Sequence, residues 1–111
     1  DGAYHDMKLL LENGLKPAPA YFADNDLIAA GTVRALKEYG YRIPEDISII
    51  GFDGSSIGKV LDPPLTSMEV PRSRLGELAV ERLIQKITLQ DETITKTEVA
   101  PKLIERKSVS L

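Results

Sequence analysis

The run Ile47-Ser48-Ile49-Ile50-Gly51-Phe52-Asp53-Gly54 is the strongest strand signal in this chain. Isoleucine is stiff at χ1 and packs well on a pleated surface, so the residues before Gly51 favour a β-strand. The apolar positions are nearly continuous rather than alternating, which is typical of a strand buried on both faces of a parallel sheet. Ligands of open parallel sheets bind just outside the carboxyl ends of the strands. Asp53 lies at that end, where its carboxylate can accept bonds from two ligand hydroxyls or face an amine.

The residues around this strand predict an alternation of helices and strands. Apolar side chains recur with helical spacing in residues 3–13, 26–39 and 71–88. Gly31 lowers the helix propensity of the second segment, so we expect close backbone packing there. Shorter runs predict a buried strand at 20–23, a strand at 65–70 and a polar edge strand at 102–109. Residues 54–59 are expected to form a loop, and residues 90–98 an exposed loop or hairpin. This alternation favours an α/β fold with a parallel sheet and right-handed crossovers.

Composition and charge narrow the class of protein. With 111 residues, 42% hydrophobic and 28% charged, the chain can form a globular domain with its own core. The net charge is −3 and the Lys and Arg residues form no basic cluster, so this region is not expected to bind nucleic acid directly. No apolar run approaches the roughly 20 residues of a membrane span. The chain has no cysteine, which fits the cytosol. It opens on Asp1-Gly2-Ala3-Tyr4 without a methionine, so we expect a larger protein.

Polar side chains follow two of the predicted strands. Asp24, Asn25 and Asp26 come after residues 20–23, and Asp53 closes the central strand. Each has a structural alternative, because short polar residues cap helices and an aspartate before glycine is common in turns. Asn25, however, offers both a donor and an acceptor to a polar ligand. Two polar strand ends facing one crevice favour ligand binding by Asn25 and Asp53.

The sequence shows no sign of a reaction centre. It has no nucleophile elbow, no glycine-rich phosphate loop, and no pair of histidines or acids at metal-site spacing. We therefore predict that the chain is not an enzyme and uses neither a cofactor nor a metal.

Linked segments in one order and spacing resemble the lactose/galactose (LacI/GalR) family of transcriptional repressors. These segments are Ala20-Tyr-Phe-Ala-Asp-Asn-Asp-Leu-Ile-Ala-Ala-Gly-Thr-Val-Arg-Ala-Leu, Gly40-Tyr-Arg-Ile-Pro-Glu-Asp-Ile-Ser-Ile-Ile-Gly-Phe-Asp, Pro63-Pro-Leu-Thr-Ser, Leu75-Gly-Glu-Leu-Ala-Val and Leu103-Ile-Glu-Arg-Lys-Ser. The resemblance covers nearly the whole chain. It implies the C-terminal part of an effector-binding domain, with a Rossmann-like parallel sheet flanked by helices in the type I periplasmic-binding-protein arrangement.

The resemblance also implies a function. Repressors of this family bind a small molecule, often a sugar or a nucleobase, between two subdomains, and the ligand shifts operator affinity through their arrangement. This chain would be the effector-sensing part of a cytoplasmic repressor, which reaches operator DNA only through a helix-turn-helix outside this sequence. The alternative is a solute-binding protein of a sugar transport system, which shares the fold. The loop at residues 42–46 and the Pro-Pro-Leu-Thr segment favour the repressor.

Family roles carry over to particular residues. The resemblance assigns effector contacts to Asn25 and Asp53, while Val70 stands where many members have a polar cleft residue. It implies a homodimer that pairs through the helix after Asn-Asp and the loop before Pro-Pro. The interface candidates are Ala30, Val33, Arg34 and Leu61.

The resemblance divides the chain into three segments. Residues 1–69 belong to one subdomain, residues 70–89 cross over and form a helix of the other, and residues 90–111 form a loop and a return strand. We expect helix 71–88 to pack on the chain's own sheet or on a second copy, because its apolar face would otherwise be exposed.

Overall fold

The computed structural model describes residues 2–110, which form two compact units. The first unit contains residues 2–69 and 103–110, and the second contains residues 70–102.

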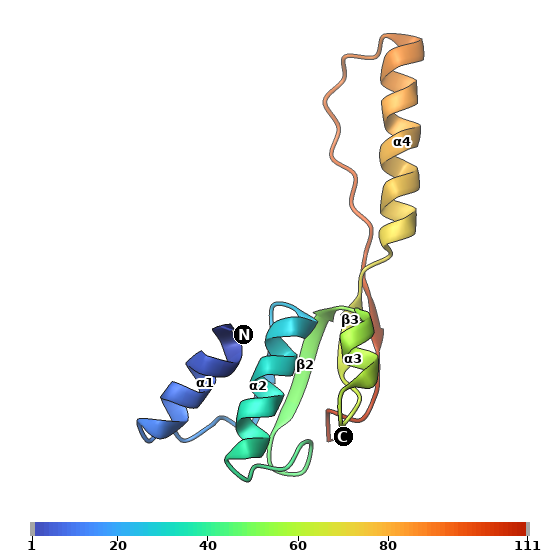
Figure 1. The fold of residues 1–111 in the computed structure, drawn as a ribbon. Helices are drawn as coiled ribbons and strands as arrows, with labels where there is room; N and C mark the ends of the chain where they lie inside the picture. The colour runs from blue at the N-terminus through green and yellow to red at the C-terminus, as the bar shows by residue number, and fades with distance from the viewer. Residues whose placement is uncertain (1, 111) are drawn as a thin grey trace. The chain divides into compact units, whose positions relative to one another are not determined.

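The first unit is built on a four-stranded sheet in the order β1-β2-β3-β4. Its strands are β1 (Ala20–Phe22), β2 (Ser48–Asp53), β3 (Thr66–Glu69) and β4 (Lys102–Ile104). Figure 1 labels its two central strands, β2 and β3. β2 runs parallel to both β1 and β3, with Phe22 opposite Ile50 and Asp53 opposite Glu69. The predicted α/β fold with a parallel sheet is confirmed, and the last strand lies at the sheet edge as expected.

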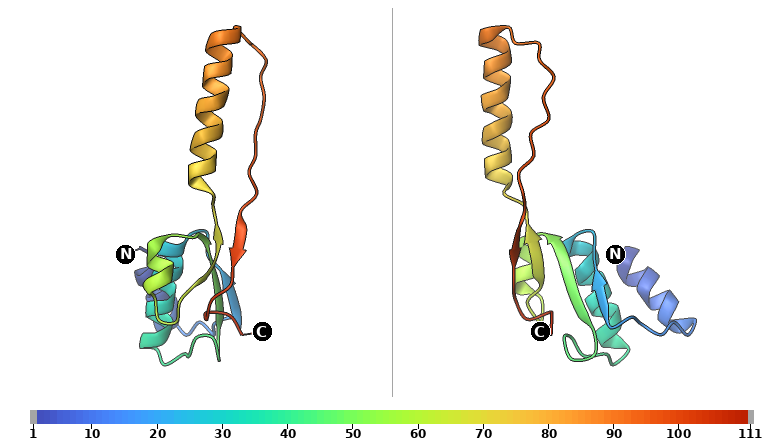
Figure 2. Two further views of the ribbon diagram at one scale, coloured as in Figure 1. Left: turned by 90° about the vertical axis from the view of Figure 1, so that its right-hand side faces the viewer. Right: turned by 180° about the vertical axis from the view of Figure 1, so that it is seen from behind.

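Three helices lie on the same side of this sheet (Figure 2). They are α1 (Gly2–Glu12), α2 (Asp26–Glu38) and α3 (Ser56–Val60). The core between helices and sheet includes fully buried Leu36, Ile49 and Leu65. A Cβ atom on Gly31 would lie 2.9 Å from the backbone nitrogen of Tyr4, so α1 and α2 approach closely at this glycine. The sequence prediction for Gly31 is therefore confirmed.

The opposite face of the sheet is less covered than the sequence predicts. Ile49 is fully buried, but Phe22 is 62% exposed and Ile50 is only half-buried. Phe22 and Phe52 pack edge to face on this side, with ring centroids 6.5 Å apart. Burial of β1 and β2 on both faces is thus a wrong prediction for residues 2–110, because the helices described here cover one face only.

Two boundaries differ from the sequence prediction. Residues 56–60 form α3 instead of a loop, although the segment is too short to show helical periodicity. The last strand ends at Ile104 instead of continuing to residue 109. Beyond it the chain returns to β2, where Ser108 accepts a 2.8 Å hydrogen bond from Ile49 N–H through its carbonyl oxygen. The Ser108 hydroxyl donates to the Ile49 carbonyl oxygen at 2.6 Å.

The second unit consists of α4 (Arg72–Leu89) and the irregular segment that follows it. Hydrogen bonds from Arg82 link this segment to the helix. The Arg82 guanidinium donates to Asp91 Oδ2 at 2.6 Å and to the Thr93 carbonyl oxygen at 2.9 Å. No residue of α4 is buried. Packing of this helix on the chain's own sheet or on a second copy stays a prediction. Among residues 2–110, no helix is long and apolar enough to cross a membrane.

Candidate functional site

Asn25 and Asp53 lie at the same edge of the sheet. Phe22 is the partner of Ile50 in the parallel pair, and each candidate residue follows its strand residue by three positions. Neighbouring strands are about 4.8 Å apart, so the two chain segments leave the sheet side by side. The fold therefore places the two residues that the sequence singles out at neighbouring strand ends.

Asn25 serves as the N-cap of α2. Its side-chain oxygen accepts a 2.8 Å hydrogen bond from the backbone N–H of Ile28, which satisfies one of the free amide groups of the first turn. The amide N–H groups of Asn25 take no part in this cap, and the side chain is half-buried. The structural role expected from residue type is confirmed, and it leaves donors for a ligand.

Asp53 has an unusual backbone conformation. Its φ is 102°, and Gly54 follows with a φ of 66°. A residue with a side chain rarely adopts such a value, and strain of this kind costs about 1–3 kcal/mol and is concentrated at ligand sites. The half-buried Asp53 therefore has a feature typical of a binding residue, which the sequence alone does not show.

Asp26 is a functional candidate whose residue type and position in the sequence indicate only a helix cap. It is 1% exposed, and its carboxylate is surrounded by donors. Oδ2 accepts from the backbone N–H and the hydroxyl of Ser55, at 2.6 and 2.9 Å, and Oδ1 accepts from the Ser67 hydroxyl at 2.6 Å. Asp26 thus joins the start of α2 to the segment after β2 and to β3. Its partners are 29 and 41 residues away, so no local pattern identifies them.

Two glycines make room for this arrangement. A Cβ atom on Gly51 would lie 2.3 Å from Asp26 Oδ1, and one on Gly54 would lie 2.8 Å from the Cα of Glu69. Both distances are far below van der Waals contact. The Gly51-Phe52-Asp53-Gly54 segment therefore has glycine where the buried carboxylate and β3 leave no space.

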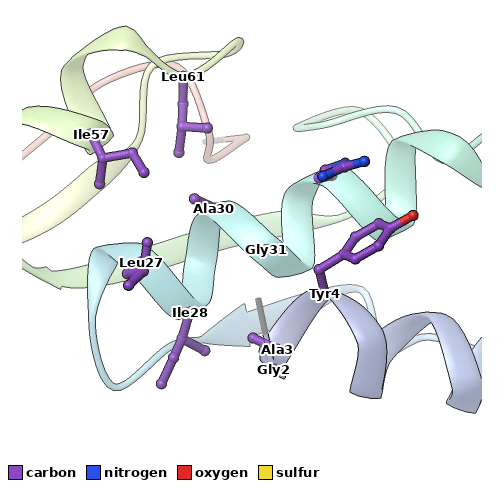
Figure 3. Close-up of a pocket in the computed structure, with 10 residues that line it drawn as sticks. Gly2, Ala3, Tyr4, Leu27, Ile28, Ala30, Gly31, Ile57 and Leu61 are labelled. Atoms are coloured by element: carbon purple, nitrogen blue, oxygen red, sulfur yellow. The ribbon is translucent and has the colours of Figure 1, made fainter.

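A second feature of the first unit is an apolar groove of about 520 Å³ on its helical side (Figure 3). The groove is lined by Gly2, Ala3, Tyr4, Leu27, Ile28, Ala30, Gly31, Arg34, Ile57 and Leu61. Three of the four predicted interface residues, Ala30, Arg34 and Leu61, belong to this lining. Val33 does not, because it is only 3% exposed and packs in the core of the chain. Val33 is therefore corrected to a core residue.

Polar contacts fix one end of the groove. The Arg34 guanidinium lies 4.2 Å from the centroid of the Tyr4 ring and donates to Glu38 Oε1 at 3.1 Å. The Tyr4 hydroxyl donates to Glu38 Oε2 at 2.7 Å, and this bond raises the pKa of Tyr4 and lowers that of Glu38. These contacts hold Tyr4 and Arg34 in place beside the apolar surface.

Metal binding finds no support in the part of the chain that the structure describes. Residues 2–110 contain no group of three or more His, Cys, Asp or Glu side chains that could hold a metal ion.

Comparison with known proteins relates almost the whole chain to one type of domain. Residues 1–109 match the model of the periplasmic binding protein-like domain. The HTH-type transcriptional repressor PurR of Edwardsiella ictaluri is 37% identical over 110 residues, which cover 99% of this chain and 32% of that protein. The chain thus spans about a third of the length of this curated relative.

Solved structures of similar proteins include ligand-bound and operator-bound regulators. A LacI family transcriptional regulator from Enterococcus faecium with bound ribose is 31% identical, with a TM-score of 0.84 over 98% of this chain and 40% of that chain. The lac repressor dimer bound to operator and the anti-inducer ONPF is 29% identical, with a TM-score of 0.87 over 96% of this chain and 37% of that chain.

Proposed function

We propose that this chain, which belongs to the periplasmic binding protein-like domain family, is the effector-sensing part of a LacI-type transcriptional repressor. The observation that carries the proposal is the placement of Asn25 and Asp53 at one carboxyl edge of a parallel sheet. Relatives named as repressors match the chain over nearly its full length.

We infer that the effector is a small polar molecule, most simply a sugar. The Asp53 carboxylate can accept bonds from two neighbouring hydroxyls, and the Asn25 amide can donate to a third. The related regulator from Enterococcus faecium binds ribose, which supports a carbohydrate. An amine or a nucleobase would satisfy the same carboxylate and is the competing ligand class.

This chain would control operator binding without contacting the DNA itself. The chain has a net charge of −3, so operator contact is assigned to a helix-turn-helix outside this sequence. Binding at the strand ends would shift the repressor between two arrangements with different operator affinity. Such a protein works in the cytoplasm without a cofactor. The relatives reported above are regulators, which weakens both the transport alternative and an enzymatic role.

The apolar groove is the proposed contact with a second copy of the chain. Ala30, Arg34 and Leu61 lie in its lining, and the related lac repressor is a dimer. Burial of the groove against its counterpart would remove apolar surface from water in a symmetric homodimer.

A binding screen on the full-length protein tests the effector proposal. Thermal shifts with ribose, lactose, cellobiose, guanine and spermidine would select the ligand class, and titration calorimetry would give its affinity. Asp53→Asn removes the carboxylate charge, yet asparagine tolerates positive φ, so the fold should persist. We expect at least a tenfold loss of affinity in a variant that still unfolds cooperatively. Equal affinity in Asp53→Asn, or binding that leaves operator affinity unchanged, would refute the proposal.

A further inference from the structure

A continuous hydrogen-bond network follows directly after Asp53. The backbone N–H of Gly54 donates to the Ser67 hydroxyl oxygen at 3.2 Å, and that hydroxyl donates to Asp26 Oδ1 at 2.6 Å. The backbone N–H of Ser55 donates to Asp26 Oδ2 at 2.6 Å. The two residues after Asp53 are therefore both tied to one buried carboxylate, one through Ser67 and one directly.

The network lies where the backbone is strained. Asp53 and Gly54 both have positive φ, and a non-glycine residue keeps such a conformation only when its surroundings fix it. Asp26 and Ser67 are 1% and 0% exposed, so their bonds are shielded from competing water. Ser55 directs its hydroxyl to Asp26 and makes no side-chain cap for α3, although it is the N-cap residue. α3 therefore lacks a side-chain cap from Ser55, because the Ser55 hydroxyl bonds to Asp26 instead.

We propose that Asp26 and Ser67 are positioning residues that hold Asp53 in its positive-φ conformation and so fix the direction of its carboxylate. Asp26 also begins α2 next to Asn25, so the same carboxylate sets the spacing of the two candidate contacts. The consequence for ligand affinity rests on the proposed function. The consequence for the backbone does not.

The chain contains a matched pair of serines for the test. Ser67 and Ser108 are both 0% exposed, and each hydroxyl donates one hydrogen bond and accepts one from a backbone N–H. Only Ser67 contacts the segment after Asp53. Ser108 bonds to Ile49 and Thr66 instead. Replacement of either by alanine removes one donated and one accepted hydrogen bond from an equally buried place, and only Ser67 donates to a charged group.

The first measurement is amide hydrogen exchange by NMR on the full-length protein and both variants. We expect the Gly54 amide to exchange at least tenfold faster in Ser67→Ala, with a smaller acceleration at Ser55, and both to remain at the wild-type rate in Ser108→Ala. Unchanged exchange at Gly54 in Ser67→Ala, or equal acceleration in both variants, would overturn the proposal.

The second measurement is affinity for ribose, lactose and cellobiose. For whichever sugar binds the wild type, Ser67→Ala should weaken binding at least tenfold, whereas Ser108→Ala should stay within twofold although it also loses two buried hydrogen bonds. Equal affinity in the two variants would show that the network does not position a ligand contact. If no sugar binds the wild type, the carbohydrate proposal fails, and the exchange rates still decide whether Asp26 and Ser67 hold the backbone.

Discussion

The side-chain oxygen of Asn25 accepts its hydrogen bond from Ile28 N–H, so one residue caps α2 and also lies at the candidate ligand edge. The two roles use different atoms and can be separated. Asn25→Asp keeps an oxygen for the cap and adds a negative charge that suits the helix N-terminus, but it loses the amide donors. We expect wild-type stability by thermal unfolding and at least a tenfold weaker affinity for the sugar that binds the wild type.

Asn25→Ala is the control for this separation, because it removes both the cap and the donors. It should lose ligand affinity and also about 1 kcal/mol of unfolding free energy. Undiminished binding by Asn25→Asp would assign Asn25 to capping alone.

Gly51 faces the buried carboxylate, and this position should not accept a side chain. Gly51→Ala would place a Cβ 2.3 Å from Asp26 Oδ1 and 2.7 Å from Leu65 Cδ2. We expect a loss of about 3 kcal/mol in urea unfolding, because overpacking adds to displacement of a buried charge from its partners. Gly76→Ala is the matched control, since nothing lies within 4 Å of the new Cβ. Alanine is the better helix former, so that variant should not be destabilised. Similar stability of the two variants would contradict the close packing at Gly51.

How far the sequence predicts the molecule can be seen by comparing Asn25 with Asp26. Helical periodicity identifies α2, and the isoleucines identify β2, because both signals are local. The carboxyl edge then follows from parallel topology, which places Asn25 and Asp53 together. Aspartate is also a common helix-capping residue, so the residue type of Asp26 does not reveal its buried hydrogen bonds. Those bonds come from Ser55 and Ser67, which lie close to Asp26 only in the folded sheet. The site's candidate contacts were predictable, whereas the network that holds them was not.

The sequence also mispredicts which apolar side chains are buried, because burial depends on contacts between distant segments. Phe22 and Ile50 are apolar, so their strands read as buried on both faces, but burial depends on which segments cover each face. Val33 follows the same helical pattern as Ala30, and only the packing of the helix distinguishes its buried side from the groove.

The loop before β2 contains an acid-sensitive contact. Asp46 accepts bonds from the Arg42 guanidinium at 2.6 and 2.9 Å and from the Arg42 backbone N–H at 2.8 Å, and these lower the pKa of Asp46 from 3.8 to about 2. A lowered folded-state pKa contributes stability that is complete above the unfolded pKa and is lost as pH falls through the folded one. The difference in melting temperature between wild type and Asp46→Asn should therefore be constant above about pH 5 and shrink from pH 4 towards pH 2.

Glu45→Gln is the control for Asp46, because it removes one charge at the neighbouring position without breaking these bonds to Arg42. Its melting temperature should lie closer to the wild-type value than that of Asp46→Asn above about pH 5, because the three bonds between Asp46 and Arg42 remain. A pH-independent offset for Asp46→Asn would show that the Arg42 contact does not contribute to stability.

The groove between the helices makes the homodimer testable through Leu27. This side chain is 65% exposed in the described chain and lines the groove, so Leu27→Arg should leave the protomer folded. A guanidinium in an apolar contact would lose its hydration without a partner, which opposes association. Analytical ultracentrifugation of the full-length protein should show at least a tenfold weaker dimer. Leu9→Arg is the matched control, since Leu9 on α1 is 58% exposed and lies outside the groove lining. Retained dimerisation in Leu27→Arg, or equal loss in both variants, would place the contact between copies on another surface.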